Sequence, residues 1–204
     1  MTFSTLAQTT IFADEPVKGS RFIGLAAPAG DEAAALATVE GARARWPDAT
    51  HHTWAFRLRG GRHRHSDDGE PGGSAGRPIL AQIDGHGLVD VVVVVVRWFG
   101  GTKLGVGGLI RAYGAAAGRT LDRAPILEVV PHVDLILTHS YDDIGAIGAV
   151  VGSWGLEVID TRWGASVQQV LRVPEARRRA LIDTLRDRTG GRVDIEPFGA
   201  EDPP

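Results

Sequence analysis

Residues 88–114 read LVDVVVVVVRWFGGTKLGVGGLIRAYG, and this stretch carries the strongest fold signal in the chain. Six consecutive valines, Val91 to Val96, leave the segment no polar side, which indicates a strand buried on both faces of its sheet. Five glycines follow within residues 100–108, and the bulky apolar residues after them are spaced as in a helix. The stretch therefore predicts a central strand, a flexible loop and a helix in a domain that mixes helices with a sheet.

The junction between this strand and this helix is also the strongest chemical signal. Unpaired amide groups and the positive end of a helix favour an anion, and Lys103 and Arg111 would flank them. The alternative is a tight turn that needs glycine, with solvated basic side chains. The stretch is neither a P-loop, because Gly-Lys-Ser/Thr is missing, nor a dinucleotide-binding fingerprint. The candidate residues for binding an anion or a partner are Arg97, Gly100, Gly101, Lys103, Gly105, Gly107, Gly108, Arg111 and Tyr113.

A second glycine-rich stretch, SDDGEPGGSAGRP at residues 66–78, places three carboxylates after a predicted strand. Such carboxylates could bind a divalent cation, act as acid and base, bond the amides of their own loop, or contact a partner. We favour a structural role, and we predict no metal and no cofactor. In that role Asp67, Asp68 or Glu70 fixes a nearby arginine, the candidates being Arg77, Arg97 and Arg111.

Periodicity and turn residues predict the other elements of residues 1–130, which we assign to a first domain. Alternating or apolar runs indicate strands, and Asp31 is a suitable helix N-cap. The HRH run at residues 63–65 is interpreted as a disordered loop tip rather than a metal site. Strands are expected at 9–12, 21–27, 51–59, 88–99 and 125–130, and helices at 31–46, 78–83 and 109–124.

Residues 131–204 are assigned to a second domain. Its predicted order is strand, helix, strand, strand, helix, strand, which is typical of a ferredoxin-like sandwich. Gly155 and Gly190 are expected to end its two helices, and Pro174 is expected to occupy the first helical position. The fold class is therefore α+β, with two domains. Residues 199–204 (GAEDPP) are expected to form a frayed tail.

Composition narrows the class of protein. The chain has 204 residues and no cysteine, which excludes disulfides and thiolate chemistry. Neither a signal peptide nor a spanning segment is evident, so a cytoplasmic protein without membrane contact is expected. The net charge is −3, but residues 1–130 hold 14 Lys and Arg against 13 Asp and Glu. A site for a polyanion would therefore be a local patch in the first domain.

The two glycine-rich motifs, DDGEPGGSAGRPIL and VVVVVVRWFGGTKLGVGGLIRAYGAA, strongly resemble the YigZ/IMPACT family. The resemblance covers about residues 15–125, including VKGSRFIG at 17–24 and ATHHTWAF at 49–56, and it extends more weakly into the second domain. Thr53 stands where the family often has cysteine, and Trp98 stands where tyrosine is usual. The resemblance adds these motif residues as candidates: Lys18, Ser20, His51, Asp67, Asp68, Gly69, Glu70 and Arg77.

The resemblance implies a first domain similar to the fourth domain of elongation factor G, in which a left-handed crossover can occur, and a second domain similar to that factor's last domain. It implies contact with RNA, the ribosome or a translation-linked protein. For the eukaryotic members it implies restraint of a starvation-responsive kinase through a shared scaffold protein. The expected function is therefore a translation-associated regulatory protein. The alternative is an enzyme acting on a nucleotide or phosphorylated metabolite, with a glycine-loop phosphate site and an Asp or Glu base.

Overall fold

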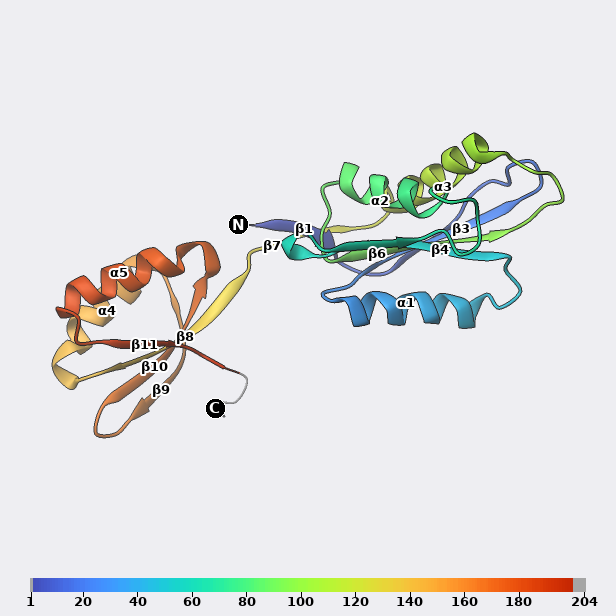
Figure 1. The fold of residues 1–204 in the computed structure, drawn as a ribbon. Helices are drawn as coiled ribbons and strands as arrows, with labels where there is room; N and C mark the ends of the chain where they lie inside the picture. Colours follow the sequence, from blue (N-terminus) through green and yellow to red (C-terminus); the bar gives the residue numbers. More distant parts are fainter. Residues whose placement is uncertain (1, 200–204) are drawn as a thin grey trace. The chain divides into compact units, whose positions relative to one another are not determined.

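The computed structural model describes residues 2–199 and divides into two compact units (Figure 1). The first unit spans Phe3–Val129, and the second contains the chain from Val130 onward. Each unit has helices and a sheet of its own, so the predicted α+β class with two domains is confirmed. No helix within residues 2–199 is long and apolar enough to cross a membrane.

The first unit is built on a five-stranded sheet in which every neighbouring pair is antiparallel. The strand β6 lies at its centre, and all six valines of this strand are fully buried, as the sequence predicts. The sheet order is β2 (Thr10–Ala13), β3 (Arg21–Pro28), β6 (Val91–Trp98), β4 (His51–Arg57) and β5 (His63–Ser66).

Helices cover both faces of this sheet (Figure 1), which explains why β6 has no wet side. Val91, Val93 and Val95 pack with α2 (Gly76–Gly85) and α3 (Val106–Leu121). The alternate valines pack with α1 (Glu32–Arg45) on the opposite face. The side chain of Asp31 accepts a hydrogen bond from the amide of Ala34 at 2.8 Å, so the predicted N-cap of α1 is confirmed.

Two strands of the first unit differ from the sequence prediction. Residues 63–66 form the edge strand β5, paired with β4, rather than a disordered tip. Their side chains are polar and largely exposed, so no apolar alternation marks the strand. The strand β1 (Phe3–Leu6) was not predicted, and it pairs with β7 (Ile126–Val129) in a separate two-stranded sheet.

The second unit has the strand order of a ferredoxin-like sandwich, with β11 beside β8, then β10 and β9, all antiparallel. Its helices lie on one face of the sheet (Figure 1). The predicted succession is confirmed as β8 (His132–His139), α4 (Ile144–Trp154), β9 (Glu157–Trp163), β10 (Val167–Pro174), α5 (Arg178–Thr189) and β11 (Asp194–Pro197).

The helix ends of the second unit agree with the glycine pattern but not with the proline prediction. Gly155 and Gly190 both have φ of 61° and end α4 and α5 in the left-handed conformation that glycine favours. Pro174 ends β10 instead of opening a helix. A 3₁₀ turn, Glu175–Arg177, then precedes α5.

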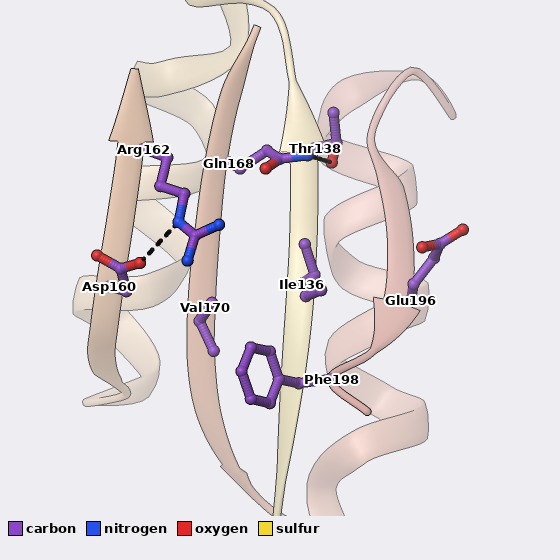
Figure 2. A pocket seen from close by; sticks show the side chains of 8 residues that line it. All are labelled: Ile136, Thr138, Asp160, Arg162, Gln168, Val170, Glu196 and Phe198. Carbon is purple, nitrogen blue, oxygen red and sulfur yellow. Dashed lines mark hydrogen bonds and ion pairs between the residues drawn. The ribbon is translucent and has the colours of Figure 1, made fainter. Parts of the chain in front are cut away.

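The other face of this sheet carries side chains of all four strands (Figure 2). It holds a shallow pocket of about 200 Å³, in which Arg162 pairs with Asp160 and Gln168 donates to Thr138. Beside the pocket Arg172 makes two hydrogen bonds to Asp134. Two pairs of opposite charge therefore lie on this face, and Glu196 of β11 adds a further carboxylate to the pocket.

Candidate anion- and partner-binding site

Asp67 organises the acidic stretch through backbone amides. Its carboxylate accepts hydrogen bonds from the N–H groups of Gly73 at 2.7 Å, Ala75 at 2.9 Å and Gly76 at 2.8 Å. Burial alone would raise the pKa of Asp67, but these three donors outweigh it and hold the pKa below its ordinary value. Asp67 therefore fixes the start of α2 and pairs with none of the three arginines proposed for it.

Asp68 ties the same stretch to α1 and β4. Its carboxylate accepts from the amide of His52 at 2.6 Å and from Arg43 at 2.7 Å. Burial opposes ionisation, yet the bonds to Arg43 and to His52 lower the pKa of Asp68. The sequence prediction missed Arg43 as a partner, because only the tertiary position of α1 brings it close. Arg77 is exposed and has no carboxylate partner within residues 2–199.

Glu70 is the carboxylate that meets the glycine-loop strand. Its Oε1 accepts from Arg97 Nη1 at 2.5 Å and from the hydroxyl of Tyr113 at 2.6 Å, and it lies 3.7 Å from His51 Nε2. The Glu70 and Arg97 side chains are only 4% and 5% exposed. Ser20 completes this group by accepting from Arg97 Nη2 at 3.1 Å. We call these five residues the Glu70 cluster.

The proton of His51 is placed by its neighbours. Its Nδ1 lies 2.8 Å from the carbonyl oxygen of Asp68, which only accepts, so Nδ1 carries the hydrogen. Nε2 of the neutral ring is therefore an acceptor, on the side of Glu70. Gly69, at φ of 85°, lies against the same ring, because a Cβ there would be 3.7 Å from it. For Tyr113, burial and then the bond to Glu70 raise the pKa well above its usual range.

Two amides at the start of the glycine loop are bonded to side-chain hydroxyl groups, contrary to the expectation that they stay free. Phe99 donates to Thr50 Oγ1 at 3.0 Å, and Gly100 donates to Ser20 Oγ at 3.2 Å. Gly100 also touches the backbone of Gly19 so closely that a Cβ would lie 1.9 Å from a carbonyl carbon. Gly100 and Gly101 are both exposed to solvent, but only Gly100 makes a close backbone contact, which leaves no room for a side chain.

The backbone amides that have no hydrogen-bond acceptor within residues 2–199 lie at the start of α3. Gly105, at φ of 73°, turns the chain into the helix, and Leu109 makes the first bond back to it. In the first turn, the backbone N–H groups of Val106, Gly107 and Gly108 donate to no acceptor in this described part of the chain. The open amides expected at this junction therefore lie at the start of the helix and not directly after Phe99.

A pocket of about 370 Å³ joins this helix start to the Glu70 cluster. Its polar lining consists of His51, Glu70, Arg97 and Lys103, and its apolar lining is mainly Phe99, Leu104, Val106 and Leu109. We call it the Glu70 pocket. Arg111 lies outside it, in a second depression with Lys18 and Arg119, and Leu104 lines both. The two cations expected to flank a single anion site thus border two adjoining depressions.

Three cations without a carboxylate partner in residues 2–199 border these two depressions. Seven arginines of the first unit form ion pairs with carboxylates: Arg43, Arg57, Arg59, Arg62, Arg64, Arg97 and Arg119. Lys18, Lys103 and Arg111 are exposed and pair with no carboxylate in the described part of the chain. We call these three residues the basic rim.

Two residues singled out from the sequence have structural contacts instead. The indole of Trp98 donates to Asp48 at 3.0 Å and stacks under Arg21, whereas the neighbouring Phe99 lines the pocket. Thr53 is buried and donates to the carbonyl of Val95 at 3.0 Å. The sequence analysis did not name Phe99 as a candidate for ligand binding, although an aromatic residue next to a glycine-rich loop can indicate a binding surface. Between residues 2 and 199, no three His, Asp or Glu side chains are grouped to hold a metal ion.

Comparison with known proteins places the chain in a family. The model of the Impact N-terminal domain matches residues 18–121, and that of a domain of unknown function (DUF1949) matches residues 137–192. The chain belongs to the IMPACT family. It is 40% identical to the IMPACT family member in pol 5'region of Thermus thermophilus over 181 residues, which are 88% of this chain and 99% of that protein.

Further relatives agree over most of the chain. It is 35% identical to IMPACT family member YigZ of Escherichia coli (strain K12), covering 89% of this chain and 91% of that one. A crystal structure of a hypothetical protein has a TM-score of 0.68 at 33% identity and 98% coverage of both chains. A larger protein of Thermus thermophilus, of which the match covers 28%, shares the fold alone, with a TM-score of 0.54 at 11% identity.

Proposed function

We propose that this chain is a translation-associated regulatory protein of the cytoplasm that binds RNA, in or around the ribosome, through the basic rim and the start of α3. The observation that carries the proposal is that three cations without carboxylate partners in residues 2–199, Lys18, Lys103 and Arg111, line the two depressions at the start of α3, where the first amides of the helix are open. Backbone phosphates are the ligands that such groups bind without sequence preference.

Apolar side chains beside the cations favour RNA over a simple anion. Phe99 is 47% exposed, and Val106 and Ile110 add apolar surface on the first turns of α3. Single-stranded nucleic acid binds where an aromatic ring for base stacking adjoins a basic track for the backbone. The net charge of −3 confines such binding to this surface and disfavours a general coat of nucleic acid.

Family membership supports the link with translation. The residues of the basic rim lie inside the match to the Impact N-terminal domain, residues 18–121. The resemblance of that domain to the fourth domain of elongation factor G extends the proposal to a ribosomal or ribosome-linked partner. Because a shared fold does not specify a partner, the binding surface itself is the feature to test.

Co-sedimentation with ribosomes over a salt series tests the proposal. Lys103→Ala and Arg111→Ala should weaken association and reduce its salt dependence, because each removes one phosphate contact. Arg45→Ala is the matched control, since it removes an equal charge from α1 on the opposite face of the sheet. Equal losses in all three variants, or no association by the wild type, would refute a role of the basic rim.

One observation favours the enzyme alternative. His51 has a fixed Nδ1 proton and an acceptor Nε2 3.7 Å from Glu70 in a pocket beside helix amides, an arrangement suited to a general base. Asp67 and Asp68 do not fit that role, because their oxygens are engaged by amides and Arg43. Saturable turnover of a nucleotide that His51→Gln abolishes would favour an enzyme over a binding protein.

A further inference from the structure

The Glu70 pocket is lined by charged groups that are almost wholly buried, which is uncommon for a surface that only attracts phosphates. Glu70 and Arg97 are 4% and 5% exposed, yet both line the pocket. Arg97 Nε is sealed from solvent with no acceptor within the described residues. A volume of about 370 Å³ is at the lower end of small-molecule sites, which span about 300–1,000 Å³.

The pocket offers two acceptors side by side. Glu70 Oε1 is occupied by Arg97 and Tyr113, but Oε2 receives no hydrogen bond from residues 2–199 and, unlike Arg97 Nε, is not sealed from solvent. In the neutral form of His51, Nε2 is the second acceptor, because Nδ1 faces the carbonyl oxygen of Asp68 and then carries the single ring proton. A ligand that fits must therefore present two neighbouring donors.

The surroundings of these acceptors disfavour a cationic ligand and favour a flat ring. Arg97 and Lys103 repel a second positive charge inside the pocket. The Phe99 ring has the Arg97 guanidinium 5.5 Å from its centroid and is otherwise half-exposed, so a ring can stack on it. Lys103 and the amides at the start of α3 provide a place for an attached phosphate.

We infer that the Glu70 pocket receives a single unstacked guanine base of an RNA strand whose backbone lies on the basic rim. Among the four RNA bases, guanine alone presents two adjacent donors, the ring N1–H and the exocyclic amine, on one edge. Cytosine and adenine present an amine beside an acceptor, and uracil presents one donor between two acceptors. The inference rests on the proposed RNA binding and adds a base preference to it.

Fluorescence anisotropy with labelled hexamers tests this preference in the full chain. The three probes are a uridine hexamer, the same hexamer with one central guanosine, and that hexamer with inosine in place of the guanosine. The guanosine and inosine hexamers differ only by the exocyclic amine, whereas the uridine hexamer also replaces the purine by a pyrimidine. The guanosine hexamer should bind about tenfold more tightly than the uridine hexamer, within the range for a bidentate base contact. Inosine lacks the exocyclic amine and should lose most of this gain.

Two variants connect the preference to the acceptors. Glu70→Gln and His51→Gln should each reduce binding of the guanosine hexamer to the level of the uridine hexamer measured with the same variant. Lys103→Ala should weaken all three hexamers by a similar factor and keep the preference. If Glu70→Gln does not fold, His51→Gln gives the same test without removing a buried charge.

The outcomes separate the two claims. Equal binding of all three hexamers to the wild type would overturn the guanine site and leave RNA binding intact. A preference that survives in both His51→Gln and Glu70→Gln would also overturn the site. If no hexamer and no ribosome binds, the proposed function fails and the guanine site fails with it.

Discussion

Glu70 Oε1 lies 2.5 Å from Arg97 Nη1, and the two side chains are buried at the point where the acidic stretch meets the central strand β6. This pair joins the two glycine-rich motifs, because one residue comes from each. Through Glu70 the acidic stretch fixes a buried arginine of the central strand. Asp67 and Asp68 instead hold the stretch in place, Asp67 through the amides at the start of α2 and Asp68 through Arg43 and the amide of His52.

Glu70→Ala should lower the free energy of unfolding by about 3–5 kcal/mol, because it leaves the Arg97 charge buried without a counterion. Urea denaturation at neutral pH measures this change. Asp84→Ala, which breaks the more exposed pair with Arg57, is the control and should cost less than about 1 kcal/mol. Similar costs for the two variants would show that the Glu70–Arg97 pair is not an essential buried contact.

Acid should weaken the acidic stretch. The folded protein holds the pKa values of Asp67 and Asp68 below their ordinary range. Each therefore contributes stability that is present above the unfolded pKa of about 3.9 and is lost as the pH falls through the folded value. The urea concentration at the midpoint of unfolding of the wild type should therefore decrease when the pH is lowered below about 4. Asp67→Asn and Asp68→Asn should flatten this fall, and an unchanged profile in both would contradict the assignment.

Asp67→Ala should destabilise the protein by about 1–2 kcal/mol at neutral pH, because it removes the acceptor for three amides at the start of α2. Thermal unfolding followed by circular dichroism reports this loss. Asp31→Ala offers a comparison at an exposed cap, where a single amide bond to Ala34 is lost. The cost at Asp67 should be the larger of the two, and the reverse order would contradict its role.

Gly100→Ala should destabilise the first unit by about 1–3 kcal/mol, because its methyl group would overlap the backbone of Gly19. Gly41→Ala is the control. It lies inside α1 with open space around it and should stabilise the protein by about 0.5–1 kcal/mol. Chemical denaturation of both variants tests the contrast, which an unchanged stability of Gly100→Ala would refute.

The logarithmic salt slope of RNA binding should fall by about 0.7 for each cation removed from the basic rim, which is the value for one phosphate of a single strand. Lys18→Ala, Lys103→Ala and Arg111→Ala should each show this decrease. A uridine hexamer at several salt concentrations provides the measurement. A slope that is unchanged in all three variants would mean that these cations contact no phosphate.

The sequence predicted those elements whose side chains mark them. Six valines with no polar side indicated the central strand, and glycines at helix ends indicated where α4 and α5 stop. The edge strand β5 escaped notice, because HRHS has no apolar face to bury. The strand β1 is short, and its pairing with β7 joins residues more than a hundred positions apart.

The candidate site was predictable in its residues more than in its geometry. The pairing of Glu70 with Arg97 was among the combinations expected from the sequence, because each residue lies in one of the two glycine-rich motifs. Two other contacts depend on elements that meet only in three dimensions. They are the hydrogen bond from Arg43 to Asp68 and the hydrogen bond from the Gly100 amide to Ser20. For the same reason the sequence could not separate the depression of Lys103 from that of Arg111.

The contact between Gly19 and Gly100 has a consequence for recognition. The turn that carries Lys18 and the coil that carries Lys103 touch backbone to backbone, with no side chain between them. Main chain rather than flexible side chains therefore sets the separation of these two anchoring points. A strand that spans both would find them already spaced before it arrives, and little of the association energy would be lost to rearranging the protein.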